Sequence, residues 1–195
     1  KGVLAGRYAL PIPALRGRHQ LDNASGALLA IEALADRLPV AQQAVRQGLL
    51  NVSLLGRFQV LPGRPTIILD VAHNPHASKA LARNLNNQGY FRQTHSVLAM
   101  LADKDVLGAV LPMAKIVDHW WLAPSEGERG LDAESLAKHV KQALESIDSK
   151  ASVTICSSIM EAYNQAKAAL QQEDRMVVWG SFVTVANVMQ EDGRC

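Results

Sequence analysis

The stretch Asp70-Val71-Ala72-His73-Asn74-Pro75 holds the most chemically capable side chains of this sequence. A carboxylate closes an apolar run, and an imidazole and an amide follow, just before a proline suited to the first turn of a helix. Asp70 could accept hydrogen bonds from a ribose or position a cation, and His73 could orient a substrate or exchange protons. The alternative is structural: Asn74 caps the helix, and Asp70 accepts backbone N–H groups of the turn. The residue types alone leave both interpretations open.

Three further loops carry charged or hydroxyl side chains. Arg57 either offers a fork-shaped donor to a phosphate or another domain, or is a solvated surface residue. Lys104 could offset phosphate charge, while Asp105 is expected to cap the helix that follows it. Gly180 and Ser181 open the last helix, where backbone N–H groups suit a carboxylate or a phosphate. A plain N-cap is the alternative for Ser181.

Several catalytic signatures are absent from the sequence. It contains no G-x-S-x-G elbow, no G-x-G-x-x-G fingerprint and no G-x-x-x-x-G-K-[ST] phosphate loop. The chain alone is therefore not expected to bind a triphosphate in the P-loop manner. His95, His119 and His139 are scattered and are interpreted as structural, because no metal-binding spacing accompanies them.

Composition and charge exclude several classes of protein. The chain has 195 residues, 48% hydrophobic and 19% charged, which is enough apolar material for a packed core. The net charge is +2 with no long run of one sign, so no nucleic-acid partner is expected. No apolar run approaches the roughly 18 residues that span a bilayer, and no signal peptide follows Lys1, so no membrane partner is expected. Cys156 and Cys195 form no C-x-x-C spacing, which indicates a reducing, cytoplasmic location.

The pattern of elements changes along the chain. Residues 24–38 and 41–50 predict two helices, the first capped by Asp22 or Asn23, and residues 51–56 predict a linker. Beyond it, short β-branched runs alternate with amphipathic segments. The predicted strands are 58–61, 66–71, 96–101, 116–123, 151–156 and 176–179, and the predicted helices are 75–85, 106–114, 132–145, 159–170 and 182–189.

Repeated strand–helix units with short links predict an α/β fold: a Rossmann-like, mostly parallel sheet with helices on both faces. The tight turn 61–65 between the first two strands adds one antiparallel edge strand. In such sheets, ligands bind outside the carboxyl ends of the strands. Those ends are 70–74, 102–105, 124–129, 157–158 and 180–181, which hold most of the polar residues that interrupt the apolar runs.

Several segments together resemble one known family. They are Leu55-Gly56-Arg57-Phe58, Leu69-Asp70-Val71-Ala72-His73-Asn74-Pro75-His76-Ala77, Met100-Leu101-Ala102-Asp103-Lys104-Asp105, Ala123-Pro124 with Arg129-Gly130, Trp179-Gly180-Ser181-Phe182, and upstream Leu10-Pro11-Ile12-Pro13 with Asn23-Ala24. Their order and spacing resemble the C-terminal part of the Mur ligase superfamily, and more closely its bacterial dihydrofolate synthase/folylpolyglutamate synthase branch. Val71 stands where sugar-nucleotide Mur ligases often have Tyr, which favours the folate branch.

The resemblance implies an ATP-dependent amide ligase that uses Mg²⁺. Such enzymes phosphorylate a carboxylate of dihydropteroate or a folate with ATP, and the α-amine of L-glutamate then attacks the acyl phosphate. It also implies that residues 1–50 end a central ATPase domain and that residues 51–195 form the linker and the C-terminal α/β domain of a monomeric protein. The family's phosphate loop and metal ligands lie in its N-terminal part, so this chain alone is expected to be inactive.

Five residues take family roles through the motifs that they match. Asn23 matches an Asn at the adenine, Arg57 an Arg that reaches the ATP phosphates, and Asp70 an Asp at the ribose and hinge. His73 and Ser181 match positions where the incoming glutamate is expected. Of these residues, Asp70 and His73 would be catalytic.

Two other functions remain open at this stage. A cell-wall Mur ligase would take a UDP-linked acceptor in place of a folate. A non-catalytic α/β module, such as a receiver-like or nucleotide-sensing domain, would have no ligase activity at all. Receiver domains cluster acidic residues at the first strand end, whereas Asp70 has no acidic neighbour in the sequence.

Overall fold

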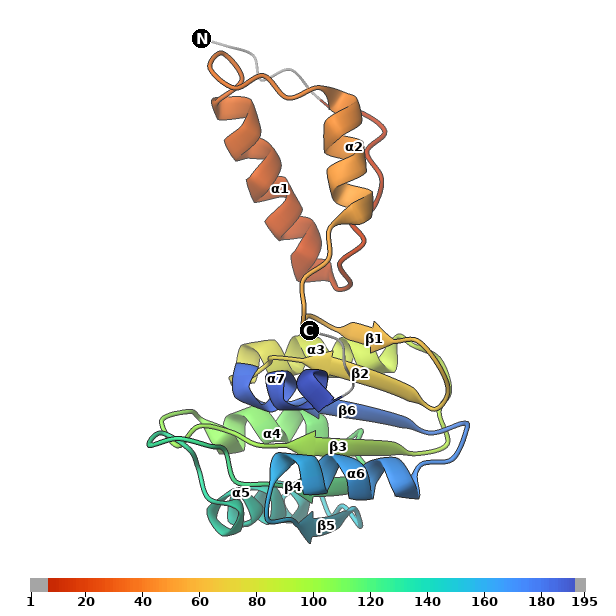
Figure 1. Cartoon of the computed structure of the whole chain (residues 1–195), viewed down its shortest axis with the longest axis vertical. Coiled ribbons are helices and arrows are strands. Elements are labelled where there is room, and N and C mark those ends of the chain that lie inside the picture. The colour runs from red at the N-terminus through yellow and green to blue at the C-terminus, as the bar shows by residue number, and fades with distance from the viewer. Residues whose placement is uncertain (1–6, 192–195) are drawn as a thin grey trace. The chain divides into compact units, whose positions relative to one another are not determined.

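The computed structural model describes residues 7–191, which form a helical unit and an α/β unit that divide between Leu54 and Leu55 (Figure 1). The division lies within the segment 51–56 that the sequence predicts as a linker. Cys195 lies outside the described residues. Within residues 7–191, none of the helices has both the length and the apolar character needed to cross a membrane.

The helical unit contains α1 (Arg18–Ala33) and α2 (Gln42–Asn51). The predicted cap of the first helix at Asp22 or Asn23 is wrong, because α1 already begins at Arg18. The residue before it, Gly17, has a φ of 114° and leaves helical geometry there, whereas no helix breaker stands between it and the Ala/Leu-rich run. Asn23 consequently lies inside α1. The predicted second helix is confirmed to within one residue at each end.

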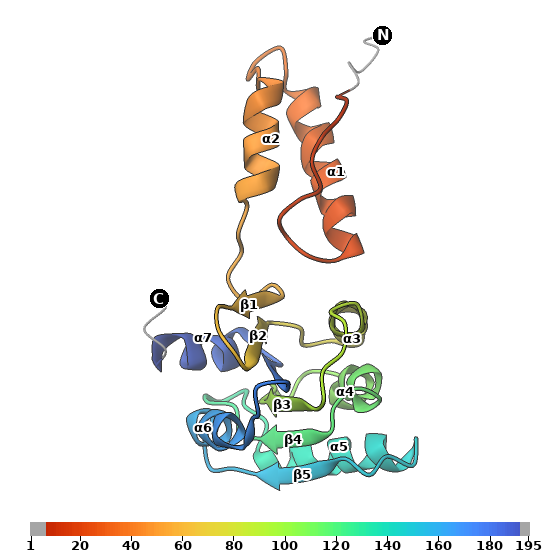
Figure 2. The ribbon, with the colours of Figure 1, turned by 90° about the vertical axis from the view of Figure 1, so that its right-hand side faces the viewer.

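The α/β unit is built on one six-stranded sheet, in which β1 runs antiparallel to β2 and all other pairs are parallel (Figures 1 and 2). The strands are β1 (Gln59–Leu61), β2 (Thr66–Asp70), β3 (Thr94–Leu98), β4 (His119–Leu122), β5 (Ser152–Ile155) and β6 (Arg175–Trp179). The helices are α3 (Pro75–Asn86), α4 (Val106–Ala114), α5 (Ala133–Glu145), α6 (Ile159–Ala169) and α7 (Phe182–Glu191). The strand order is β1-β2-β6-β3-β4-β5, so the predicted fold class is confirmed.

Two predicted strands have misplaced ends, and the third also begins two residues earlier than predicted, at Thr94. The third ends at Leu98 rather than at residue 101, because the carbonyls of Ala99 and Met100 accept hydrogen bonds from Thr184 Oγ1 and Leu131 N instead of a neighbouring strand. The fourth begins at His119 rather than at residue 116. Residues 116 and 117 belong to the turn that closes α4, where both of their N–H groups bond to the Met113 carbonyl.

Two apolar layers cover the sheet, one on each face (Figure 2). Ile68, Leu98 and Val177 face a core that includes residues of α3, α4 and α5. The alternate positions of the same strands, such as Val97 and Val178, face residues of α6 and α7. The period-two alternation of side chains along a strand explains this division.

A buried histidine lies in β3 near the amino ends of the parallel strands. His95 is 2% exposed, and its ring centroid lies 4.6 Å from that of His119. Trp121 Nε1 donates a hydrogen bond to His95 Nδ1 at 3.3 Å, so the neutral ring carries its proton on Nε2. Burial, and then repulsion from His119, lowers the pKa of His95.

We expect acid to destabilise the fold through His95. The folded state keeps this imidazole neutral, whereas the unfolded chain protonates it near its ordinary pKa of about 6.5. The stability that the fold gains by keeping His95 neutral is therefore complete above that pH and is lost as the pH falls. His95→Gln retains an acceptor for Trp121, so its Tm should fall less than that of the wild type between about pH 7.5 and about pH 5.5. Equal falls in thermal melts would contradict this assignment.

Candidate functional site

Asp70 ends β2, and its carboxylate bonds to backbone N–H groups of two different segments. Oδ2 accepts from Phe58 N at 2.9 Å, and Oδ1 accepts from Ala72 N at 2.8 Å. The residue is only 9% exposed. Asp70 therefore ties the segment before β1 to the turn after β2, which is the structural role that the sequence left open.

His73 and Asn74 occupy the turn between β2 and α3. Asn74 caps α3, since its Oδ1 accepts from Ala77 N at 2.9 Å, and Pro75 occupies the first turn as predicted. His73 Nδ1 lies 2.9 Å from the Val71 carbonyl oxygen. Because a carbonyl only accepts, Nδ1 carries the proton, and Nε2 of the neutral ring is the atom left to accept a hydrogen bond or a proton.

Arg57 has a rigid backbone and an exposed side chain. The neighbouring Gly56 accepts from Val71 N at 2.8 Å and donates to Gln59 Oε1 at 2.9 Å, and its φ of +67° favours glycine. A Cβ on Gly56 would approach Val71 Cγ1 to 2.8 Å. The Arg57 guanidinium extends from this loop, with its Cζ 6.0 Å from the centroid of the Phe182 ring.

The turn after β6 is held closely against β3. Gly180 has a φ of +114°, and a Cβ there would lie 2.3 Å from the Ala99 carbonyl oxygen, so only glycine fits without a shift. Ser181 is buried, and its Oγ accepts from Thr184 N at 3.0 Å. Thr184 Oγ1 donates to Ala99 O, so the Ser181 hydroxyl is the donor in the 2.7 Å contact between the two hydroxyls. Ser181 is thus a helix cap whose hydroxyl donates one hydrogen bond and accepts another.

The loops after β3 and β4 add an ion-paired cluster. Asp105 caps α4 through Gly108 N at 2.9 Å, as predicted. Asp103 Oδ2 lies 2.6 Å from Arg129 Nη2 and 3.3 Å from Lys104 Nζ. The bond from Arg129, followed by that from Lys104, lowers the pKa of Asp103. Arg129 was not among the candidates from sequence, although its position in a strand-end loop was the signal for it.

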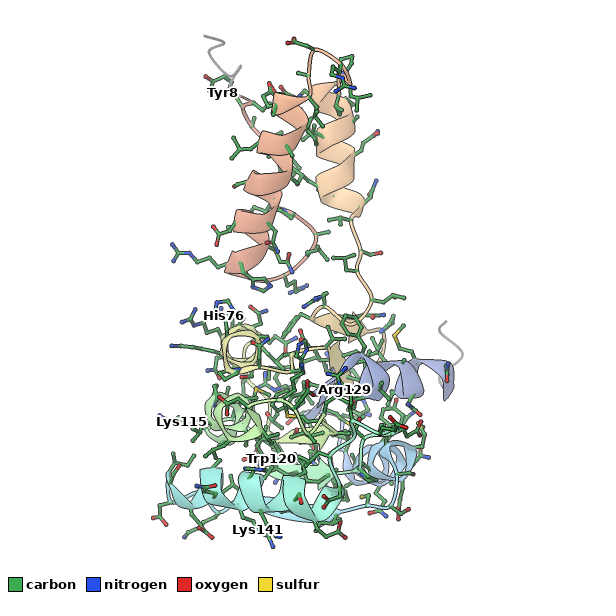
Figure 3. All side chains as sticks on the ribbon, turned by 90° about the vertical axis from the view of Figure 1, so that its left-hand side faces the viewer. Tyr8, His76, Lys115, Trp120, Arg129 and Lys141 are labelled. Carbon is green, nitrogen blue, oxygen red and sulfur yellow. The ribbon has the colours of Figure 1, made fainter. Side chains whose placement is uncertain are left out.

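Parallel pairing brings these loops to one edge of the sheet. Leu98 pairs with both Trp179 and Leu122, and Asp70 pairs with Trp179, so β2, β6, β3 and β4 end side by side. The loops after β3 and β4 project on the left of Figure 1, and Figure 3 views that end, where Arg129 is labelled. Four predicted site residues belong to this edge: Arg57, Asp70, His73 and Ser181.

The fifth predicted residue, Asn23, belongs to the helical unit. It is exposed, and its Nδ2 donates to Gln20 Oε1 at 3.0 Å. Both residues line a groove of about 390 Å³ between α1 and α2, whose other lining is apolar and includes Leu28 and Val45. An exposed amide beside an apolar surface can recognise a planar polar ring.

The comparisons with known proteins decide the family. Residues 56–182 match the family model described as Mur ligase, glutamate ligase domain. The chain belongs to the Mur ligase family. The matched segment begins at Gly56 and ends at Phe182, so it contains the edge described above.

Several of the similar proteins are named as dihydrofolate and folylpolyglutamate synthases. The dihydrofolate synthase/folylpolyglutamate synthase of Escherichia coli is 38% identical over 181 residues, which is 93% of this chain and 39% of that protein. The E. coli FolC structure in complex with DHPP and ADP has a TM-score of 0.82 and 36% identity, and the match covers 96% of this chain and 42% of that one. A structure of a bifunctional folylpolyglutamate synthase/dihydrofolate synthase with Mn, AMPPNP and L-glutamate bound has a TM-score of 0.80 and 38% identity. That match covers 95% of this chain and 41% of the other chain. The chain thus spans about two fifths of these relatives.

We expect Asp70→Asn to destabilise the α/β unit. An amide has one acceptor oxygen, so one of the two backbone N–H groups loses its partner and the charge assistance disappears. The free energy of unfolding should fall by about 1–3 kcal/mol. Asp105→Asn is the matched control, because an amide caps a helix as well as a carboxylate does. Chemical denaturation of both variants measures the difference, and equal stabilities would refute the anchoring role.

Proposed function

We propose that this chain is the C-terminal part of an ATP-dependent amide ligase that adds L-glutamate to dihydropteroate, to folylpolyglutamate or to both. The match of residues 56–182 to the glutamate ligase domain carries this proposal. It is supported by the polar groups that gather at the ligand edge of the sheet, and by relatives whose structures contain DHPP, ADP and glutamate.

The reaction consists of two group transfers. The acceptor carboxylate attacks the γ-phosphorus of ATP, which yields an acyl phosphate and ADP. The glutamate amine then attacks the acyl carbon, and phosphate leaves with the electrons of the broken C–O bond. A divalent cation, which we take to be Mg²⁺, would offset the phosphoryl charge. The described residues contain no group of three or more His, Cys, Asp or Glu that could hold a metal, so we assign it no ligand here.

Arg57 is the residue we assign to the ATP phosphates. Its backbone is anchored to β2 on both sides, while its exposed guanidinium can donate in a fork to phosphoryl oxygens. Asn23 is assigned to the adenine, since its amide can both donate and accept at the rim of an apolar groove. Asp70 serves this site as the anchor of the Arg57 segment, and its contact with the ribose remains a prediction.

Glutamate is assigned to the edge where β2 and β6 end. His73 offers Nε2 to the ammonium group when neutral, or a charged N–H to a carboxylate when protonated. Ser181 contributes indirectly, because its hydroxyl is bonded within the α7 cap and shapes the first turn whose N–H groups suit a carboxylate. We assign the loss of the amine proton to solvent rather than to His73.

One assay separates this function from the two alternatives. ADP release by the full-length gene product would be measured with glutamate and, in turn, dihydropteroate, tetrahydrofolate or a UDP-linked sugar acceptor. Turnover with the first two supports the folate ligase, and turnover with the third alone identifies a cell-wall ligase. No turnover with any acceptor favours a binding module. The 195-residue chain alone should be inactive, and the same assay tests that expectation. A monomeric state and a cytoplasmic location also remain predictions.

We expect Arg57→Ala in the full-length gene product to lower turnover about 10²–10³-fold, as removal of a charge-assisted contact to a reacting group does. The Tm should hardly change, because the side chain is exposed and only the loop backbone contributes to folding. Arg64→Ala, which changes another arginine in the turn between β1 and β2, is the control. A normal rate combined with a lowered Tm would instead make Arg57 structural.

We expect His73→Ala to raise the KM for glutamate more than the KM for ATP. The imidazole is assigned to the amino acid, and its loss leaves the Asn74 cap of α3 in place. Steady-state kinetics with each substrate varied in turn measure both constants. His76→Ala is the matched control, because His76 is an exposed imidazole three residues further along the chain, in the first turn of α3. An unchanged glutamate KM would remove His73 from the glutamate site.

A further inference from the structure

Phe182 places an aromatic ring in solvent at the ligand edge of the sheet. It begins α7 and is 61% exposed, whereas Val185, Val188 and Met189 of the same helix are buried in the core. The ring therefore adds little to the packing of the unit. Its charged neighbour is Arg57, whose Cζ lies 6.0 Å from the ring centroid, at the outer limit of a cation–π contact.

The backbones that carry the two side chains are held independently. Gly56 and Phe58, on either side of Arg57, bond to the end of β2 and to the residue after it, through the Asp70 carboxylate and Val71 N. Phe182 follows Gly180 and Ser181, which are held against β3 by close packing and by the hydrogen bonds of Thr184. The contact between the Arg57 guanidinium and the Phe182 ring thus joins two side chains whose backbone segments are each fixed by hydrogen bonds and packing.

Contact with the face of a ring leaves the guanidinium N–H groups free. Within residues 7–191, the Arg57 side chain makes no hydrogen bond or ion pair. The contact of its charged group is with the Phe182 ring. An unrestrained arginine side chain samples many rotamers and loses that freedom when an anion binds. A ring that already holds the guanidinium reduces this loss, while the N–H bonds remain available in the guanidinium plane.

We infer that Phe182 is a positioning residue, which holds Arg57 at the ligand edge for a phosphoryl group. This inference rests on the proposed function, in which Arg57 contacts the ATP phosphates. It gives an otherwise unexplained exposed aromatic residue a role in catalysis without any contact between that residue and the reacting atoms. Phe182 is then needed for its ring rather than for its apolar volume.

A double-mutant cycle in the full-length gene product tests the inference. Phe182→Leu keeps apolar volume but removes the aromatic face, so kcat/KM for ATP should fall about two- to five-fold, the equivalent of one exposed cation–π contact. Phe182→Tyr should restore the wild-type value. In the Arg57→Ala background, Phe182→Leu should have no further effect. Tyr90→Leu is the control, since Tyr90 is 86% exposed and lies after α3, at the amino end of β3.

Two outcomes of the cycle would overturn the inference: an unchanged kcat/KM in Phe182→Leu, or the same loss in both backgrounds. The 195-residue chain gives a second, independent measurement. The side-chain protons of Arg57 should show an upfield ring-current shift in NMR spectra that Phe182→Leu abolishes, and no such shift would also overturn the inference. If the shift is present and Arg57→Ala leaves turnover unchanged, the proposed phosphate role of Arg57 fails, and the positioning role in catalysis fails with it.

Discussion

The carboxylate of Asp70 is the constraint on which the candidate site depends. A single side chain at the end of β2 accepts N–H groups from Phe58 and Ala72. It thereby joins the segment that carries Arg57 to the turn that carries His73. Buried N–H groups are costly to leave without partners, so the two bonds hold both segments at the edge of the sheet. The sequence motif assigns Asp70 to ligand contact, whereas in the structure its carboxylate holds the backbone segments on either side of the site.

A second anchor holds the other side of the same edge. Gly180 approaches the end of β3 so closely that a Cβ would lie 2.3 Å from the Ala99 carbonyl oxygen, and Thr184 bonds to that same oxygen. The beginning of α7 is therefore held against the end of β3 as well as capped locally by Ser181. Between the two anchors, Arg57 and His73 present nitrogen atoms, while Asp70 and Ser181 are engaged in backbone and cap hydrogen bonds.

This arrangement places hydrogen-bond donors that suit anions at the edge of the sheet. The edge carries the donors Arg57, His73, Lys104 and Arg129 together with several carboxylates, of which Asp103 is ion-paired with Arg129 and Lys104. A ligase that joins a phosphorylated carboxylate to an amino acid needs such donors around both substrates.

The sequence alone determined the α/β class, the existence and order of the strands and helices of the second unit, and the edge at which the polar loops meet. Strand alternation, short connections and the caps Asn74 and Asp105 are local signals, and parallel strands have their carboxyl ends on one side by geometry. The sequence missed the start of α1, because nothing between Gly17 and Asn23 breaks a helix, and it also missed the end of α1, which stops at Ala33 rather than at residue 38. It misplaced the ends of β3 and β4 as well. It could not decide whether Asp70 and Ser181 face a ligand or the backbone. Only the tertiary structure decided that. Phe58, which bonds to Asp70, comes from a different segment, and Thr184, which bonds to Ser181, is itself held by the Ala99 carbonyl at the end of β3.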